Sequence, residues 1–215
     1  MKDNFNTLKD DQFGIYKDRG SKFIAYAFPM VSLVDFEMKL ASIQKEHPKA
    51  RHFCYAYNLG IDEAQHRYND DGEPGGSAGL PIHNQLLSND LYESGVIVVR
   101  YFGGKKLGVP GLINAYKESA KEAINAAGVV RKFILSVYRI SFEYDQTGLI
   151  MRVINDTGIK IIENGYLDKP FIVFSVRRSE GEYIRTKLLG MLLNRELSDI
   201  SGDEQIEGYT LEQLK

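Results

Sequence analysis

The sequence predicts an α+β protein built from two domains. Three observations lead to this prediction: segments typical of strands and of helices are mixed along the whole chain, two glycine-rich loops flank one apolar strand, and the pattern breaks near residues 129–136. At 215 residues the chain is long enough for each part to bury a core. We expect a first domain over residues 1–133 and a second over residues 134–215.

In the first domain, apolar patterns predict four strands and three helices. The strands are expected over residues 23–29, 52–59, 64–68 and 96–101, and the helices over 33–46, from 81 onward and over 112–127. Ser32 is a potential N-cap of the first helix, and Gly128 is a natural C-cap of the third. Pro81 lies where the first turn of the second helix would start.

The second domain shows a recognisable order of elements. A strand (135–144), a helix (147–155), two strands (158–163 and 171–177), a helix (181–193) and a strand (205–211) follow one another. Asn164-Gly165 and Asp168-Lys169-Pro170 are expected to connect the two middle strands of this order. The resulting β-α-β-β-α-β order is the split βαβ, or ferredoxin-like, plan.

Composition and charge exclude several classes of protein. Hydrophobic residues make up 43% of the chain and charged residues 26%, which is typical of a globular protein and not of a disordered one. The formal net charge is −2, so any contact with nucleic acid must depend on a local patch. Cys54 is the single cysteine, which excludes an intrachain disulfide and a cysteine-rich zinc site. Because we find no apolar signal core and no stretch of membrane-spanning length, we expect a cytoplasmic protein with no membrane partner.

The first glycine-rich loop is acidic. It contains Asp70, Asp71, Gly72, Glu73, Pro74 and Ser77. Its three carboxylates lie within four residues, a spacing that can bring oxygen atoms to one hard cation such as Mg²⁺ or supply an acid or base. The other interpretation is a turn in which the aspartates hydrogen-bond the loop backbone while the glycines take positive φ. We favour the turn, because carboxylates are common turn residues and the calcium-loop pattern is absent.

The second glycine-rich loop is basic and aromatic. It contains Arg100, Tyr101, Phe102, Gly103, Gly104, Lys105 and Lys106. Cations, aromatic rings and exposed glycine amides suit phosphate contact and base stacking. Arg19 and Lys22 would extend the same patch if the strand over 23–29 lies beside the strand over 96–101. The alternative is a tight turn with solvated lysines. The spacing matches neither a Walker loop nor a dinucleotide fingerprint.

Nucleophilic chemistry has weaker support. His52 and Cys54 lie two residues apart on a predicted strand, so they would share a face and could in principle form an activated pair. Cys54, however, lies in an apolar aromatic run, which is typical of a small buried hydrophobic residue. Ser77 lies in Gly-Gly-Ser-Ala-Gly, but no buried strand runs straight into it as a nucleophile elbow requires. The sequence therefore predicts no catalytic residue, no metal site and no cofactor.

The two glycine-rich loops together resemble the signatures of the YigZ/IMPACT family. The first signature is carried by 70–74, 77–79 and 81–82, and the second by 100–104, 106–108, 111–112 and 115–116. Residues 17–24 and 51–57 also fit its N-terminal pattern, so the resemblance covers about residues 5–130. Pro110 and Asn114 stand where many members carry glycine and arginine, and the missing cation weakens the expectation of phosphate contact at the start of that helix.

This resemblance implies a fold and a class of function. It implies an N-terminal ribosomal protein S5 domain 2-like α/β domain followed by a C-terminal ferredoxin-like domain similar to elongation factor G domains. Both folds recur in the translation machinery, and the family has been proposed to bind nucleic acid or to regulate translation. We therefore expect a non-enzymatic binding or regulatory protein whose partner is RNA, the ribosome or a translation-related protein. The alternative is a metal-assisted hydrolase or phosphate-ester enzyme that uses Asp70, Asp71 and Glu73.

Overall fold

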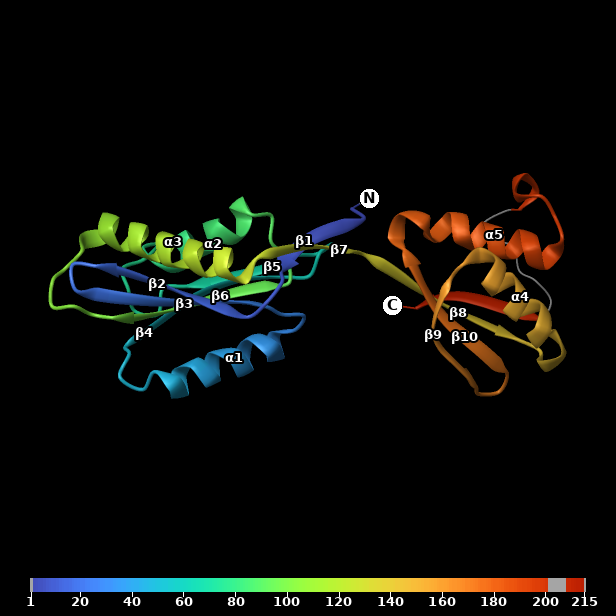
Figure 1. Ribbon diagram of the computed structural model, residues 1–215, viewed down its shortest axis with the longest axis horizontal. Helices are drawn as coiled ribbons and strands as arrows, with labels where there is room; N and C mark the ends of the chain where they lie inside the picture. Colours follow the sequence, from blue (N-terminus) through green and yellow to red (C-terminus); the bar gives the residue numbers. More distant parts are fainter. Residues whose placement is uncertain (1, 201–207, 215) are drawn as a thin grey trace. The chain divides into compact units, whose positions relative to one another are not determined.

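The computed structural model describes residues 2–200 and 208–214, which form an α+β protein with two sheet-containing units (Figure 1). The N-terminal unit is Phe5–Lys132. The C-terminal unit begins at Phe133 and also includes the first few residues of the chain. The described residues contain five α-helices, and no helix among them is both long and apolar enough to cross a membrane.

The N-terminal unit is a three-layer arrangement around an antiparallel five-stranded sheet. The strands are β2 (Gln12–Asp18), β3 (Ser21–Pro29), β4 (His52–Leu59), β5 (Gln65–Asn69) and β6 (Ser94–Tyr101), in the spatial order β2-β3-β6-β4-β5. Helix α1 (Leu33–Glu46) covers one face, and α2 (Gly79–Ser88) and α3 (Gly108–Ala127) cover the other (Figure 1). A separate two-stranded sheet joins β1 (Asn4–Leu8) to β7 (Val129–Phe133).

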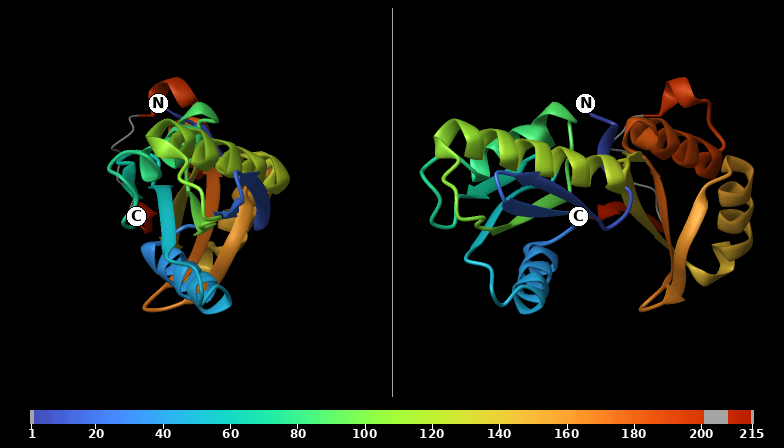
Figure 2. Two further views of the ribbon diagram at one scale, coloured as in Figure 1. Left: turned by 90° about the vertical axis from the view of Figure 1, so that its left-hand side faces the viewer. Right: turned by 60° about the vertical axis from the view of Figure 1, so that its left-hand side comes forward.

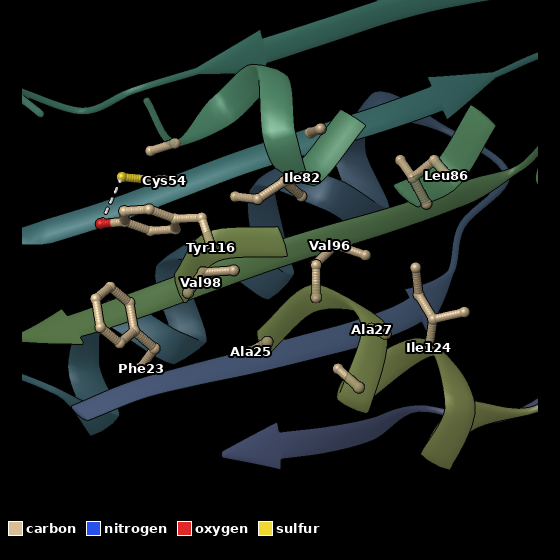
Figure 3. Close-up of a cluster of buried hydrophobic side chains, with 14 of the residues drawn as sticks. Phe23, Ala25, Ala27, Cys54, Ile82, Leu86, Val96, Val98, Tyr116 and Ile124 are labelled. Atoms are coloured by element: carbon tan, nitrogen blue, oxygen red, sulfur yellow. Dashed lines mark hydrogen bonds between the residues drawn. The ribbon is translucent and has the colours of Figure 1, made fainter. Parts of the chain in front are cut away.

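Alternation along the strands builds two cores, one on each face of the sheet. Side chains from β3, β4 and β6 point alternately towards α1 and towards the α2–α3 layer. The core under α2 and α3 includes Phe23, Cys54, Val98 and Tyr116, which are all fully buried (Figure 3). The central strand β6 is buried on both faces as far as Arg100.

Local sequence explains where α1 and α3 begin. Ser32 caps α1: its hydroxyl accepts from the Asp35 amide while the Asp35 carboxylate accepts from the Ser32 amide, which is a capping box. Helix α3 begins at Gly108, four residues before the expected start at Leu112. Pro110 fits there because the first turn of a helix leaves its amides without partners inside the helix. The basic loop is correspondingly shorter than the sequence predicts.

The C-terminal unit has the expected β-α-β-β-α-β order. Its elements are β8 (Leu135–Phe142), α4 (Thr147–Thr157), β9 (Lys160–Tyr166), β10 (Pro170–Arg177), α5 (Gly181–Leu193) and β11 (Tyr209–Leu214). The antiparallel sheet has the order β11-β8-β10-β9, and both helices cover one face of it (Figure 2). Single 3₁₀ turns lie at Tyr144–Gln146, Arg178–Glu180 and Leu197–Asp199.

Several predicted boundaries were wrong. Asn164-Gly165 belongs to β9 and not to the connection, since its residues pair with β10; the turn is closed by a bond from the Leu167 amide to the Lys169 carbonyl. The last strand begins at Tyr209, and residues 205–207 of the predicted strand lie outside the described residues.

β1, β2 and β7 were not predicted. β2 is an edge strand with Phe13 and Ile15 exposed, so its residues do not show the burial that reveals a central strand.

Candidate nucleic-acid interface

The structure brings both glycine-rich loops to one end of the five-stranded sheet, which we call the loop end. The acidic loop (70–78) leads from β5 into α2, and the basic loop (102–107) leads from β6 into α3. The strand register places His52, at the start of β4, opposite Arg100, near the end of β6. Lys22 of β3 lies opposite Tyr101 in the same register. The loop end therefore combines residues from β3, β4, β6 and both loops.

Asp70 organises the acidic loop from within. One carboxylate oxygen accepts from the amides of Ala78 and Gly79 at 2.9 and 2.8 Å, and the other accepts from the Gly76 amide at 2.9 Å. These bonds close the loop and anchor the first residue of α2. The geometry is that of the turn interpretation, in which an aspartate hydrogen-bonds the loop backbone.

Asp71 ties the same loop to the start of β4. Its carboxylate accepts from the Phe53 amide at 2.6 Å, and its carbonyl oxygen accepts from His52 Nδ1 at 2.8 Å. Asp71 and Gly72 both have positive φ, at 41° and 83°, so the chain turns back at these residues and brings Asp71 against β4. Asp71 thus holds the acidic loop beside β4.

Glu73 and Arg100 join the two loops through a buried ion pair. Glu73 Oε1 lies 2.5 Å from Arg100 Nη1 and accepts from the Tyr116 hydroxyl at 2.8 Å. The side chains of Glu73 and Arg100 are only 4% and 8% exposed. The guanidinium also packs over the rings of Phe23 and Phe102. Strand alternation turns Arg100 towards the α2–α3 layer, so its charge, unlike those of Lys105 and Lys106, is buried and paired.

The buried thiol of Cys54 extends this network and is not a nucleophile. Its Sγ lies 3.0 Å from the Asp70 carbonyl oxygen and 3.3 Å from the Tyr116 hydroxyl (Figure 3). Burial raises the pKa of the Cys54 thiol and of the Tyr116 hydroxyl far above their ordinary values, so both stay protonated. His52 donates to the Asp71 carbonyl and not to Cys54, so the pair considered from the sequence does not form.

The three carboxylates of the acidic loop face different partners. Asp70 accepts from loop amides, Asp71 from the Phe53 amide, and Glu73 from Arg100 and Tyr116. Within residues 2–200 and 208–214, no group of three His, Cys, Asp or Glu side chains is arranged to hold a metal ion. Ser77 of the same loop is buried, and its hydroxyl has no partner among the described residues.

The basic loop is fixed at Gly103 and open at Gly104. The Gly103 amide donates to Ser21 Oγ at 3.1 Å, and a Cβ at Gly103 would lie 1.9 Å from the Gly20 carbonyl carbon. The β2–β3 turn, with Arg19 at φ 44° and Gly20 at φ 83°, therefore packs directly on the loop backbone. A Cβ at Gly104 would meet open space.

Four cationic side chains lie on the two segments that meet here, the β2–β3 hairpin and the basic loop. The pairing of β3 with β6 fulfils the condition under which Arg19 and Lys22 extend the patch. Arg19, Lys105 and Lys106 are exposed and Lys22 is half-buried, and none of the four forms an ion pair with another described residue. Phe102 lies in the same loop and is 60% exposed. The loop end thus offers unpaired positive charge beside an exposed aromatic ring.

A pocket of about 350 Å³ opens at the loop end. It is lined by Lys49, Arg51, His52, Arg100, Tyr101 and Phe102. The sequence-based prediction missed Lys49 and Arg51, although the basic run 49–52 directly after the Pro48 helix stop was a signal that could have revealed them. Among the described residues, none of the side chains that line it is acidic.

Tyr101 is held in this pocket by a chain of hydrogen bonds at the end of α1. Its hydroxyl lies 2.9 Å from His47 Nδ1, and His47 Nε2 lies 2.7 Å from the Tyr26 hydroxyl. Tyr26 also donates to Glu46 at 3.1 Å, and burial together with Glu46 raises the pKa of Tyr26. The phenol ring of Tyr101 is therefore positioned before any ligand arrives.

Comparison with known proteins assigns the chain to a family. The pattern described as the Impact N-terminal domain matches residues 19–124, which include both loops and the β2–β3 turn. A family member from Haemophilus influenzae is 31% identical over 170 residues, which cover 78% of this chain and 82% of that one. The chain belongs to the IMPACT family. The family member YvyE of Bacillus subtilis is 34% identical over 146 residues, 68% of this chain and 67% of its own length.

One solved structure resembles this chain over its whole length. A crystal structure of a hypothetical protein matches 100% of this chain and 99% of its own, with 26% identity and a TM-score of 0.72. The two-domain translational regulator Yih1 is 27% identical over 57% of this chain and 47% of its own. Its TM-score of 0.36 is too low to show a shared overall structure. The family resemblance read from the two loops is confirmed.

Proposed function

We propose that this IMPACT-family protein is a non-enzymatic RNA-binding protein and that it contacts RNA through the loop end of its N-terminal unit. The observation that carries the proposal is the set of unpaired cations, Arg19, Lys22, Lys105 and Lys106, beside the exposed ring of Phe102. Cations that follow a phosphate backbone and rings on which bases stack are the two components of single-strand recognition.

The charge distribution explains how a protein of net charge −2 can bind a polyanion. Salt screens exposed charges over about 10 Å at 0.1 M ionic strength, so a ligand at the loop end responds mainly to the local charge. There, Arg100 neutralises Glu73, and the charges that remain on Asp70 and Asp71 are outnumbered by the cations Arg19, Lys22, Lys105 and Lys106. The lysines of the basic loop have no such partner among the described residues. The local field at the loop end is therefore positive.

The hydrolase alternative has less support. It needs Asp70, Asp71 and Glu73 to present oxygen atoms to one cation, whereas these side chains accept from amides, a guanidinium and a phenol in separate directions. The Cys54 thiol, the other candidate for chemistry, is fully buried and protonated. We accordingly favour binding over catalysis.

We further propose that the two units are related in fold to translation proteins. The N-terminal unit would be of the ribosomal protein S5 domain 2 type, and the C-terminal unit would be ferredoxin-like and similar to elongation factor G domains. The sheet order β11-β8-β10-β9 supports the second assignment, because the first and third strands of the β-α-β-β-α-β order lie side by side at its centre. Such a relationship makes structured RNA of the ribosome the natural second ligand to test.

A fluorescence anisotropy titration with a short labelled single-stranded RNA tests the proposal. We expect binding to weaken as the salt concentration rises. In the double variant Lys105→Glu with Lys106→Glu, the slope of log Kd against log salt should fall by about 2, one for each lost phosphate contact. The matched control is Lys9→Glu with Lys121→Glu, which makes the same charge change at exposed positions outside the loop end.

Three results would overturn this function. One is the absence of salt-dependent binding by the unmodified protein to single-stranded and to ribosomal RNA. Another is an equal loss in the control variant, because this would show that net charge and not the loop end governs binding. Capture of a translation protein without RNA would instead assign the loop end to a protein partner and contradict the proposal.

A further inference from the structure

We propose that the pocket lined by Lys49, Arg51, His52, Arg100, Tyr101 and Phe102 binds a phosphate monoester attached to a nucleoside, as found at the phosphorylated end of an RNA strand. This inference rests on the proposed function and deepens it, because it names the chemical group that the pocket takes. Exposed lysines of the basic loop would then hold the following backbone phosphates.

The charge of the pocket fits a monoester better than a diester. Lys49 and Arg51 are exposed and form no ion pair with another described residue, so they supply two uncompensated positive charges. A phosphate monoester carries about −1.5 to −2 charge at pH 7, whereas each internal phosphodiester carries about −1. None of the described side chains that line the pocket is acidic, and the neighbouring Glu73 carboxylate is paired with Arg100, so the cations of the pocket lining are in excess.

Arg100 forms the buried side of the pocket. Its Nη1 is taken by Glu73, but its Nε is buried and has no hydrogen-bond partner among the described residues. Because Glu73 neutralises the guanidinium and both side chains are enclosed by protein, Arg100 shapes the pocket without adding to its net charge.

His52 is held in one orientation at the pocket. Its Nδ1 lies 2.8 Å from the Asp71 carbonyl oxygen, which can only accept, so Nδ1 must carry a proton. In the neutral ring this leaves Nε2 as an acceptor, which suits a ribose hydroxyl of the nucleoside and not a phosphate oxygen. The acidic loop therefore acts on the pocket indirectly, since the backbone of Asp71 fixes the ring of His52.

The size and aromatic lining of the pocket suit a single nucleotide. A volume of about 350 Å³ is at the lower end of the range for small-molecule sites, so it suits a single nucleotide and not a folded RNA segment. Phe102, 60% exposed, offers a ring on which a base can stack, and Tyr101 is held in place by His47. Such preorganisation lowers the entropy lost on binding.

The test uses three RNAs of one short sequence: one with a 5′-phosphate, one with a 3′-phosphate and one with hydroxyls at both ends. Each carries an internal fluorescent label, and its Kd is measured by fluorescence anisotropy. We expect a terminally phosphorylated RNA to bind about tenfold more tightly than the hydroxyl form, as two charge-assisted contacts would give. Lys49→Ala with Arg51→Ala should abolish this preference and retain the weaker binding of the hydroxyl RNA. The matched variant, Lys105→Ala with Lys106→Ala, should weaken all three RNAs by a similar factor.

Competition with a nucleoside 5′-monophosphate, the parent nucleoside and inorganic phosphate identifies the source of the group. Displacement of the phosphorylated RNA by the monophosphate at micromolar concentration would show that a free nucleotide suffices; displacement only by phosphorylated RNA would show that the strand is needed. Equal binding of the phosphorylated and hydroxyl RNAs would overturn the pocket assignment alone. If no RNA binds at all, the proposed function fails as well.

Discussion

The acidic loop and the basic loop are both rich in glycine and in charge, yet they use their charges in opposite ways. In the acidic loop, Asp70, Asp71 and Glu73 accept hydrogen bonds from the protein itself. In the basic loop, the backbone is fixed through Gly103, and Lys105 and Lys106 extend into solvent without partners among the described residues. One loop stabilises the loop end, and the other leaves its charges available.

The difference shows that the charge of a loop predicts little until its hydrogen-bond partners are known. A carboxylate that already accepts from two or three amides has fewer lone pairs left for a ligand. A solvated lysine loses only mobility and bound counterions when it meets a phosphate. The division between the loops can be tested by substitutions that should affect stability in one loop and binding in the other.

Removal of Glu73 should have the largest effect on stability. Glu73→Ala leaves the buried guanidinium of Arg100 unpaired, which typically costs about 3–5 kcal/mol. Urea denaturation would measure this loss. The control is Glu73→Leu with Arg100→Met, which removes both charges and should recover much of the stability. A single variant as stable as the unmodified protein would show that the ion pair does not hold the loops together.

Removal of the Asp70 carboxylate should be the next most severe change. Asp70→Ala leaves three loop amides without their acceptor, and we expect a loss of about 3 kcal/mol. Asp71→Ala is the matched control, because its carboxylate accepts from one amide only and its loss should cost about 1 kcal/mol. Similar losses in the two variants would contradict the central role of Asp70 in the loop.

The two adjacent glycines of the basic loop should differ in a measurable way. In Gly103→Ala the new methyl group collides with the backbone of Gly20, and we expect a cost of about 2–3 kcal/mol. In Gly104→Ala the methyl group meets open space, so only the strain of φ +84° remains, about 1 kcal/mol. Thermal unfolding compares them, and the reverse order would refute the packing of the turn on this loop.

The lysines of the basic loop should contribute least to stability. Lys105→Ala with Lys106→Ala should change the free energy of unfolding by less than about 0.5 kcal/mol, because both side chains are exposed. The same protein, assayed for RNA binding, should be clearly weakened. Substantial destabilisation would mean that these lysines belong to the architecture, as the residues of the acidic loop do.

Sequence patterns predicted most elements because their signals are local. Ser32 with Asp35 marks the start of α1, and the bounds of α5, Gly181–Leu193, agree with the prediction. The start of α3 was missed because Gly108 and Pro110 oppose helix formation by propensity, although Pro110 is tolerated in a first turn. The edge strand β2 was not predicted, because its residues are exposed or only partly buried and show no buried apolar face.

The candidate site could be predicted only in part, because its decisive contacts are distant in sequence. Arg100 and Glu73 are 27 residues apart, so their ion pair and the burial of Arg100 depend on the tertiary fold. Lys49 and Arg51 enter the pocket through the pairing of β4 with β6. The exposed lysines 105 and 106, by contrast, were recognisable because glycines and charged residues directly adjoin them.

The most direct test of the division between the loops is the mapping of RNA contacts by NMR. Backbone amide signals of the ¹⁵N-labelled protein would be followed during titration with a short single-stranded RNA. We predict that the shifts concentrate at residues 19–22, 49–52 and 102–106, and that the amides of Gly76, Ala78 and Gly79, bonded to Asp70, stay unchanged. Shifts centred on residues 70–79, or none at saturating RNA, would contradict the account.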